Sequence, residues 1–136
     1  MGDYTVKRLD EMERAFGGMW VRARASLGAK AFGFQVTDFP PGAPDVYPMH
    51  THEHDGQEEV YIVLDGGGEM TLDGEKVRVD RDTWVRVGPS VKRHIKADPE
   101  GMRLLAIGGV PGGVYTAPAP TELGGPEELG EGAVHE

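Results

Sequence analysis

The chain has 136 residues, no cysteine and a formal net charge of −9. A chain of this length fits one domain. The lack of cysteine excludes disulfides and thiolate metal sites, so any metal must be held by nitrogen or oxygen ligands. The acidic balance excludes the basic face that nucleic-acid and anionic-membrane binders present, so we expect neither partner.

The N-terminus shows no export signal. Residues 1–14 are a charged mixture without the apolar run of a signal peptide, and no segment of the chain approaches the ~18 apolar residues of a membrane span. We therefore expect a cytoplasmic protein.

Residues 1–29 are predicted to be an N-terminal lead-in. Apolar residues recur there every three or four positions, a spacing that predicts a short amphipathic helix broken at Gly17-Gly18. These residues are Leu9, Met12, Phe16 and Trp20. We expect their side chains to cover one end of the main domain or a partner subunit.

Residues 30–110 carry the pattern of an all-β domain. Short runs of β-forming residues alternate with turns, and the 21 Gly and 10 Pro residues of the chain favour turns over long helices. Asp73-Gly74 predicts a tight hairpin turn, and Gly66-Gly67-Gly68 predicts a turn that ends a strand. The predicted strands are residues 30–39, 58–64, 69–72, 75–79, 83–87, 94–97 and 102–107.

Residues 111–136 are rich in Gly, Pro and Glu. Such a composition buries little apolar surface against its ordering entropy. We expect an extended or disordered tail, or one laid across a neighbouring surface.

Three histidines stand two residues apart: His50, His52 and His54. In a strand, this period places all three on one face. Imidazoles are the commonest ligands of transition metals, and Glu59 supplies a carboxylate close by. The pattern favours a divalent metal site, whereas the turn expected at Asp55-Gly56 favours a solvated loop.

Residues 48–66 resemble the first motif of the cupin superfamily. That motif reads His, one residue, His, three or four residues, Glu, six residues, Gly, and the residues that satisfy it are His52, His54, Glu59 and Gly66. A second register takes His50 and His52, because a proline often precedes the paired histidines in cupins and Pro48 matches it. Both registers stay open, and Glu59 is favoured over Glu58 by its spacing to Gly66.

Residues 82–94 resemble the second cupin motif imperfectly. With Gly88-Pro89-Ser90 as its turn, the position of the third histidine falls on Arg93, and His94 comes one residue late. A shift of one residue turns a strand side chain to the opposite face, so His94 reaches the site only if a bulge follows Ser90. An inward Arg93 would instead pair with Glu59 or bind an anionic ligand.

The resemblance implies an all-β double-stranded β-helix, which is the cupin or jelly-roll barrel. Cupins include metal-dependent dioxygenases, isomerases, epimerases and decarboxylases, and also binding domains without catalysis. The expected cofactor is a divalent transition metal (Fe, Mn, Ni or Zn) that polarises a small organic molecule. Its expected ligands are His50, His52, His54, Glu59 and His94, and the expected pocket residues are Tyr61, Trp84 and Arg93.

The alternative is a metal-free cupin that binds a small anionic ligand near Arg93 or has a structural role. The expected partner under both hypotheses is a small-molecule ligand, except where the metal-free cupin has only a structural role. An isolated barrel of this size leaves strand edges that a second copy would cover, so we expect a homodimer.

Overall fold

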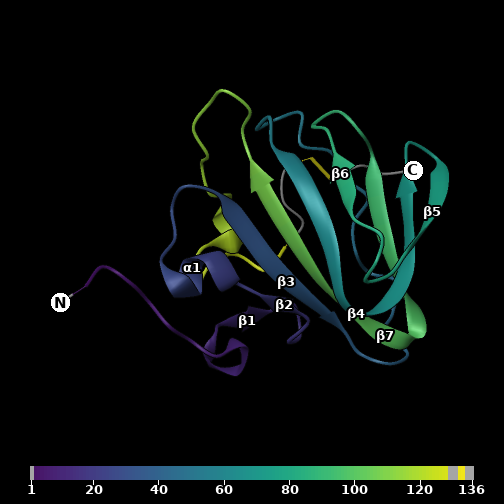
Figure 1. The fold of residues 1–136 in the computed structure, drawn as a ribbon, viewed down its shortest axis with the longest axis horizontal. Helices are drawn as coiled ribbons and strands as arrows, with labels where there is room; N and C mark the ends of the chain where they lie inside the picture. The colour runs from purple at the N-terminus through teal and green to yellow at the C-terminus, as the bar shows by residue number, and fades with distance from the viewer. Residues whose placement is uncertain (1, 129–131, 134–136) are drawn as a thin grey trace.

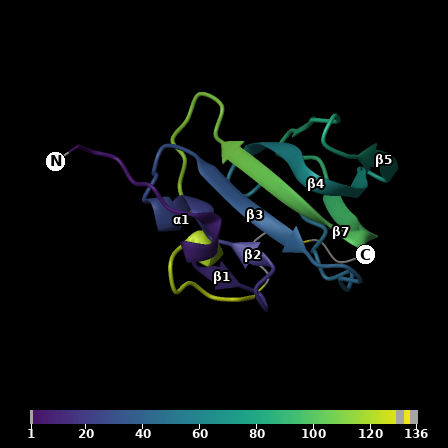
Figure 2. The ribbon, with the colours of Figure 1, turned by 60° about the horizontal axis from the view of Figure 1, so that its bottom comes forward.

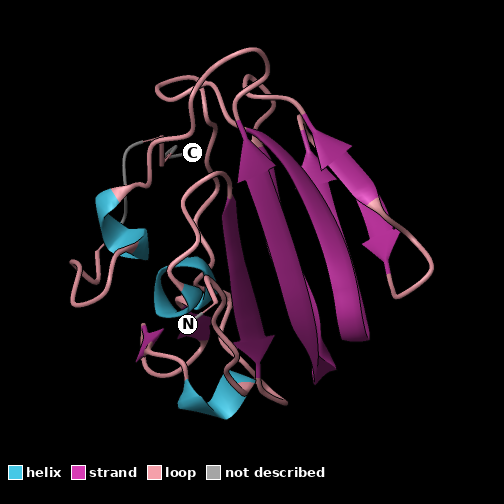
Figure 3. Ribbon diagram, turned by 60° about the vertical axis from the view of Figure 1, so that its left-hand side comes forward, coloured by secondary structure: helices cyan, strands magenta, loops and turns pink. Residues whose placement is uncertain are grey.

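Antiparallel strands dominate the computed structural model, which describes residues 2–128 and 132–133 (Figures 1 and 3). The expected all-β class is confirmed. No helix in the described part of the chain is long and apolar enough to span a membrane. The elements are η1 (Leu9–Glu11), β1 (Arg14–Ala15), β2 (Trp20–Val21), α1 (Ala23–Leu27), β3 (Gly33–Phe39), β4 (Glu58–Leu72), β5 (Glu75–Val79), β6 (Val85–Val87), β7 (Arg93–Gly109) and η2 (Ala119–Thr121).

Two long strands, β4 and β7, form the frame of the barrel. They pair in two stretches separated by register shifts: residues 58–66 with 102–109, and residues 68–72 with 93–97. The first stretch is flanked by β3 and β6, and the second by β5. The shifts bend both strands, so each contributes to both layers of the barrel.

The prediction that Gly66-Gly67-Gly68 ends a strand is wrong, because these glycines lie inside β4. A Cβ atom on Gly66 would clash with the carbonyl oxygen of Gly101, and one on Gly68 with that of Lys96. Glycine therefore lets β4 bend while its backbone stays close to β7. The predicted strands 94–97 and 102–107 likewise join into β7.

The helix predicted from the spacing of Leu9, Met12, Phe16 and Trp20 is also wrong. Only residues 9–11 form a single 3-10 turn, and β1 and β2 follow as a small hairpin. Its turn holds Phe16, Gly17 and Gly18 at positive φ. The Gly-Gly pair therefore reverses the chain, and β2 extends the sheet beyond β3.

The described part of the tail lies against the N-terminal segment (Figure 2). Arg22, which is 3% exposed, donates hydrogen bonds to the carbonyl oxygens of Pro120 and Gly125. The carboxylate of Glu127 accepts one from the backbone N–H of Phe16. These contacts fix residues 119–127, whereas residues 129–131 and 134–136 of the predicted tail lie outside the described residues.

The core lies in the interior of the barrel and takes side chains from both layers. Apolar side chains from β3, β4, β5, β6 and β7 contact one another there. They belong to Phe39, Tyr61, Val63, Met70, Val79, Val85, Val87, Ile95, Met102 and Leu104.

Truncating Leu104 to alanine tests this assignment, because its side chain is 1% exposed. The variant leaves a cavity, and we expect the free energy of unfolding to fall by about 2–5 kcal/mol in urea denaturation. Leu64, 43% exposed, is the matched control, and its change to alanine should cost less than about 0.5 kcal/mol. Equal losses in the two variants would contradict the core described above.

Candidate metal centre

His50 enters the site through backbone pairing with the start of β7. Its N–H and C=O each bond to Arg93 at 3.0 Å. On its other side, Ala133 forms a bridge with His50, and Thr51 donates a 2.9 Å hydrogen bond to the carbonyl oxygen of Gly132. The C-terminal segment thus holds the histidine loop from outside, a role that the sequence did not predict.

The three histidines do not share one strand, because the chain turns after Thr51, as the alternative of a loop at Asp55-Gly56 expected. The carbonyl oxygen of His52 accepts hydrogen bonds from Asp55 (3.3 Å) and Gly56 (2.7 Å), and Gly56 has a φ of 72°. The turn nevertheless keeps the rings adjacent: the centroids of His50 and His52 are 5.1 Å apart, and those of His52 and His54 are 5.8 Å apart.

The structure brings His50, His52 and Glu59 together. Each offers a ligand atom, and these atoms lie within 4.8 Å of one another. His52 Nε2 is 3.2 Å from Glu59 Oε1. His54 joins a second group with His52 and Asp55, nearer the surface, in which His54 Nε2 lies 3.4 Å from Asp55 Oδ2.

Hydrogen bonds outside the cluster orient both histidine rings. His50 Nδ1 lies 3.1 Å from the carbonyl oxygen of Pro48, and His52 Nδ1 lies 3.0 Å from Asp55 Oδ1. These oxygens only accept, so each Nδ1 donates, and Nε2 is the nitrogen that can bind a metal once His52 has lost the proton it shares with Glu59. Metal-ligating histidines are commonly oriented in this way.

Glu59 is the anionic member of the cluster. Its Oε1 accepts hydrogen bonds from the Tyr61 hydroxyl at 2.5 Å and from Arg93 Nη1 at 2.8 Å. Burial acts to raise the pKa of Glu59, but the hydrogen bond and charge of His52 and the hydrogen bond of Tyr61 lower it to about 2. Glu59 is therefore ionised at neutral pH.

The two histidines differ in their protonation. Burial lowers the pKa of His50 below its usual range, which favours a neutral ring with a free lone pair. Burial acts in the same direction on His52, but the hydrogen bond and charge of Glu59 outweigh it and raise the pKa of His52. A metal at this site would replace the proton that His52 shares with Glu59.

Arg93 occupies the place where the second motif expects a histidine. Its side chain is 0% exposed and points inward, donating from Nη1 to Glu59, from Nε to the carbonyl oxygen of Val91 at 3.2 Å, and from Nη2 to that of Gly88. His94 therefore points outward, where Nε2 lies 2.9 Å from Asp45 Oδ1. The pairing of β4 with β7 shows no bulge at this point, so His94 lies outside the cluster.

Two of the three expected pocket residues contact the cluster, and the third does not. Tyr61 and Arg93 contact Glu59, whereas Trp84 is 66% exposed and lies immediately before β6. The sequence analysis missed Asp55 as a partner of His52, although its place in the turn three residues after His52 was a usable signal.

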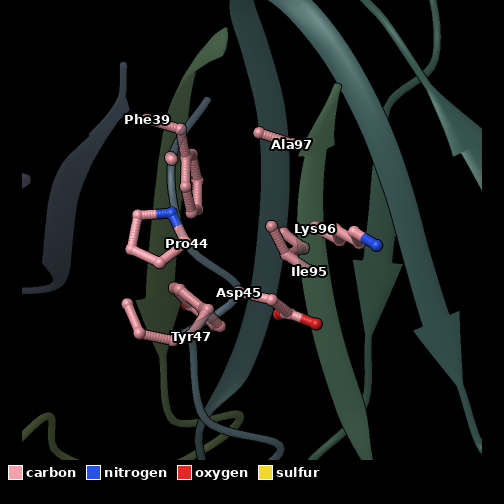
Figure 4. Close-up of a pocket in the computed structure, with 9 residues that line it drawn as sticks. Phe39, Pro44, Asp45, Tyr47, Ile95, Lys96 and Ala97 are labelled. Atoms are coloured by element: carbon pink, nitrogen blue, oxygen red, sulfur yellow. The ribbon is translucent and has the colours of Figure 1, made fainter. Parts of the chain in front are cut away.

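Tyr47 is the other residue that the sequence analysis missed. Its ring lies 5.9 Å from that of His50, and burial raises its pKa. Tyr47 also lines a small hollow beside β7, whose lining includes none of His50, His52 and Glu59 (Figure 4). The lining residues are Phe39, Ala43, Pro44, Asp45, Val46, Tyr47, Ile95, Lys96 and Ala97.

Several solved structures resemble this fold. A cupin protein from Bacteroides fragilis is 24% identical with a TM-score of 0.66, and the match covers 100% of both chains. An RmlC-like cupin protein from Desulfovibrio desulfuricans is 23% identical with a TM-score of 0.51, over 60% of this chain and 74% of that one. A DMSP lyase from Ruegeria pomeroyi is 22% identical with a TM-score of 0.51, over 65% of this chain and 42% of that one.

At these identities the likeness shows the fold alone. A search of curated proteins returned no match. The model of the cupin domain matches residues 35–108, which is more than half of the sequence and includes β4, β6 and most of β3 and β7. The chain belongs to the cupin family.

Proposed function

We propose that this cupin binds one divalent transition metal ion (Fe, Mn, Ni or Zn) through His50, His52 and Glu59 and presents it to a small organic molecule. The orientation of the two imidazoles carries the proposal, because both Nδ1 atoms are engaged outside the cluster. Two imidazoles and one carboxylate suit these ions and leave coordination positions for a ligand.

The positive charge of Arg93 disfavours a metal ion nearby. The three donors must therefore be able to bind a metal in the presence of this charge. The contacts of His52, Tyr61 and Arg93 with Glu59 all go to Oε1. Oε2 makes none of these contacts, so it is the oxygen available to a metal. The donor set therefore fits a three-ligand centre in which Arg93 fixes the carboxylate instead of supplying a fourth ligand.

A bound metal would act there as a Lewis acid that polarises an oxygen of the ligand. The residues of this chain position the donors. Arg93 and Tyr61 hold the Glu59 carboxylate, and Asp55 and Pro48 orient the two imidazoles. The ligand would take the coordination positions that these three donors leave open.

A second candidate function is a metal-free site that binds an organic anion. The complete burial of the cationic Arg93 beside two histidines favours it. However, all three guanidinium nitrogens already donate to acceptors of this chain, so an anion would have to displace Glu59. This cost makes metal binding the better supported function.

The homodimer and the cytoplasmic location stay predictions. The N-terminal arm is consistent with a homodimer, because residues 2–8 project from the body of the molecule with Tyr4 78% and Val6 86% exposed (Figure 1).

Replacing His50 or His52 with alanine tests the metal site. Each variant removes one of three donors, so we expect the metal affinity to fall more than the ~10–100-fold that the loss of an orienting partner costs. Apo protein is titrated calorimetrically with Fe(II), Mn, Ni and Zn, and stoichiometry is checked by elemental analysis. Wild-type protein should bind about one ion per chain.

His94→Ala is the matched control, because His94 pairs with Asp45 outside the cluster. The metal affinity of this variant should stay within about threefold of the wild-type affinity. His54→Ala distinguishes the two histidine groups, since a larger loss there than in His50→Ala would assign the ion to His52, His54 and Asp55. Wild-type protein that binds none of the four metals would refute the proposal and favour the anion-binding site.

The C-terminal segment provides a test that leaves every ligand intact. A Cβ atom on Gly132 would clash with the Thr51 carbonyl oxygen and contact the His54 ring, so Gly132→Ala should release the segment from the histidine loop. We expect metal affinity to fall about 10-fold, as when an orienting partner is lost. Gly124→Ala is the matched control: its φ is also positive (+69°), but a Cβ atom there meets nothing within 4 Å.

Metal affinity is again measured by calorimetry, and the chemical shifts of the His50 and His52 rings report whether the loop has moved. Equal affinities in Gly132→Ala and wild type would show that the segment plays no part in ordering the site.

A further inference from the structure

Gln35, on β3, is a buried polar residue with no hydrogen-bond partner within the described ranges 2–128 and 132–133. It is 9% exposed, and both polar atoms of its carboxamide, Nε2 and Oε1, are buried and unpaired. Buried carboxamides are nearly always hydrogen-bonded, because an unpaired donor or acceptor loses its bond to water without compensation. The pairing partner of Gln35 is therefore none of the residues that the structure describes.

The strand register shows that Gln35 points into the barrel. Gln35 on β3 lies opposite Ala106 on β7, and Ala106 lies opposite Tyr61 on β4. Residues opposed in this way share one face of a sheet. Tyr61 belongs to the interior core, and so does Phe39, which follows Gln35 at the same parity on β3.

This row lies directly beside the candidate metal centre. Tyr61 donates its hydroxyl hydrogen bond to Glu59, and Gln35 lies two strands away from Tyr61, a backbone separation of about 10 Å. The only residue between them in the row is Ala106, which has a single methyl group. The carboxamide thus faces the same interior as the cluster at a distance that a small molecule can span.

We propose that Gln35 binds the distal end of the small molecule whose other end binds the metal, and that this distal end is a neutral amide-type group. The proposal rests on the function proposed above. A carboxamide offers one donor and one acceptor side by side, and an amide or lactam edge satisfies both atoms. A carboxylate would satisfy only Nε2 and would place its charge against Oε1.

Three probes with the same metal-binding hydroxamate and the same chain length test the inference: the monohydroxamate of succinamide, ending in a primary amide; that of succinic acid, ending in a carboxylate; and pentanohydroxamate, ending in a methyl group. Their affinities for the metal-loaded protein are measured by calorimetry. The side-chain amide resonances of Gln35 report contact directly. The expected order places the amide probe about 10-fold above the methyl probe, with the carboxylate probe weakest.

The Gln35→Leu variant keeps the size of the side chain and removes the carboxamide. In this variant the advantage of the amide probe should disappear, while the methyl probe binds as tightly as before or more tightly. Equal affinities of the three probes for wild type, or an amide advantage that survives in Gln35→Leu, would overturn the inference and leave Gln35 with a structural water only.

Metal content is measured on the same samples, which separates the two proposals. Protein that holds metal and does not distinguish the probes contradicts the role of Gln35 alone. Protein that holds no metal and binds none of the three probes contradicts both the metal centre and the ligand inferred from it.

Discussion

The ion pair between Arg93 and Glu59 is the interaction on which the site depends, because it crosses the barrel from one layer to the other. Glu59 lies in the stretch of β4 beside β3 and β6, and Arg93 lies in the stretch of β7 that pairs with the far end of β4. Charges in the interior are costly unless paired and hydrogen-bonded, so neither side chain is tolerated there without the other. Carbonyl groups of Val91 and Gly88 hold the guanidinium from behind. Since the backbone of Arg93 pairs with His50, the same residue also places the first histidine.

The ion pair also determines what kind of centre this cupin can form. A histidine at the position of Arg93 would add a neutral fourth ligand, whereas arginine adds a positive charge that Glu59 partly neutralises. The proposed centre would have two imidazoles and one carboxylate whose charge is shared, so it would attract a cation less strongly than a four-ligand centre. It also leaves more coordination positions to an exogenous ligand. A centre with three protein ligands would therefore favour the presentation of a small molecule over tight structural binding of the metal.

The segments outside the barrel support the site from two sides. The tail is attached to the N-terminal segment through buried Arg22, and its last described residues pair with His50 and Thr51. The histidine loop, which has little regular structure of its own, is thereby held between β7 and the end of the chain. Inside the barrel, the interior face of β3 offers the carboxamide of Gln35, which has no partner among the residues that the structure describes. An ordered histidine cluster at one end and an open hydrogen-bonding capacity at the other end are what the proposed two-point ligand site would require.

The sequence by itself determined the all-β class, the hairpin at Asp73-Gly74 and the His and Glu residues of the cluster, because strand periodicity, turn chemistry and ligand chemistry are local properties. It also showed that the register after Ser90 puts either Arg93 or His94 inside. Only the tertiary structure decided between them, placed His50 and His52 beside Glu59 and His54 beside Asp55, and brought residues 132–133 to the loop. These outcomes depend on pairings between residues far apart in the chain, and on backbone approaches such as Gly66 to Gly101 that turn an expected chain reversal into a bend. No local pattern encodes such contacts, since their free energy arises only when the two layers of the barrel pack together.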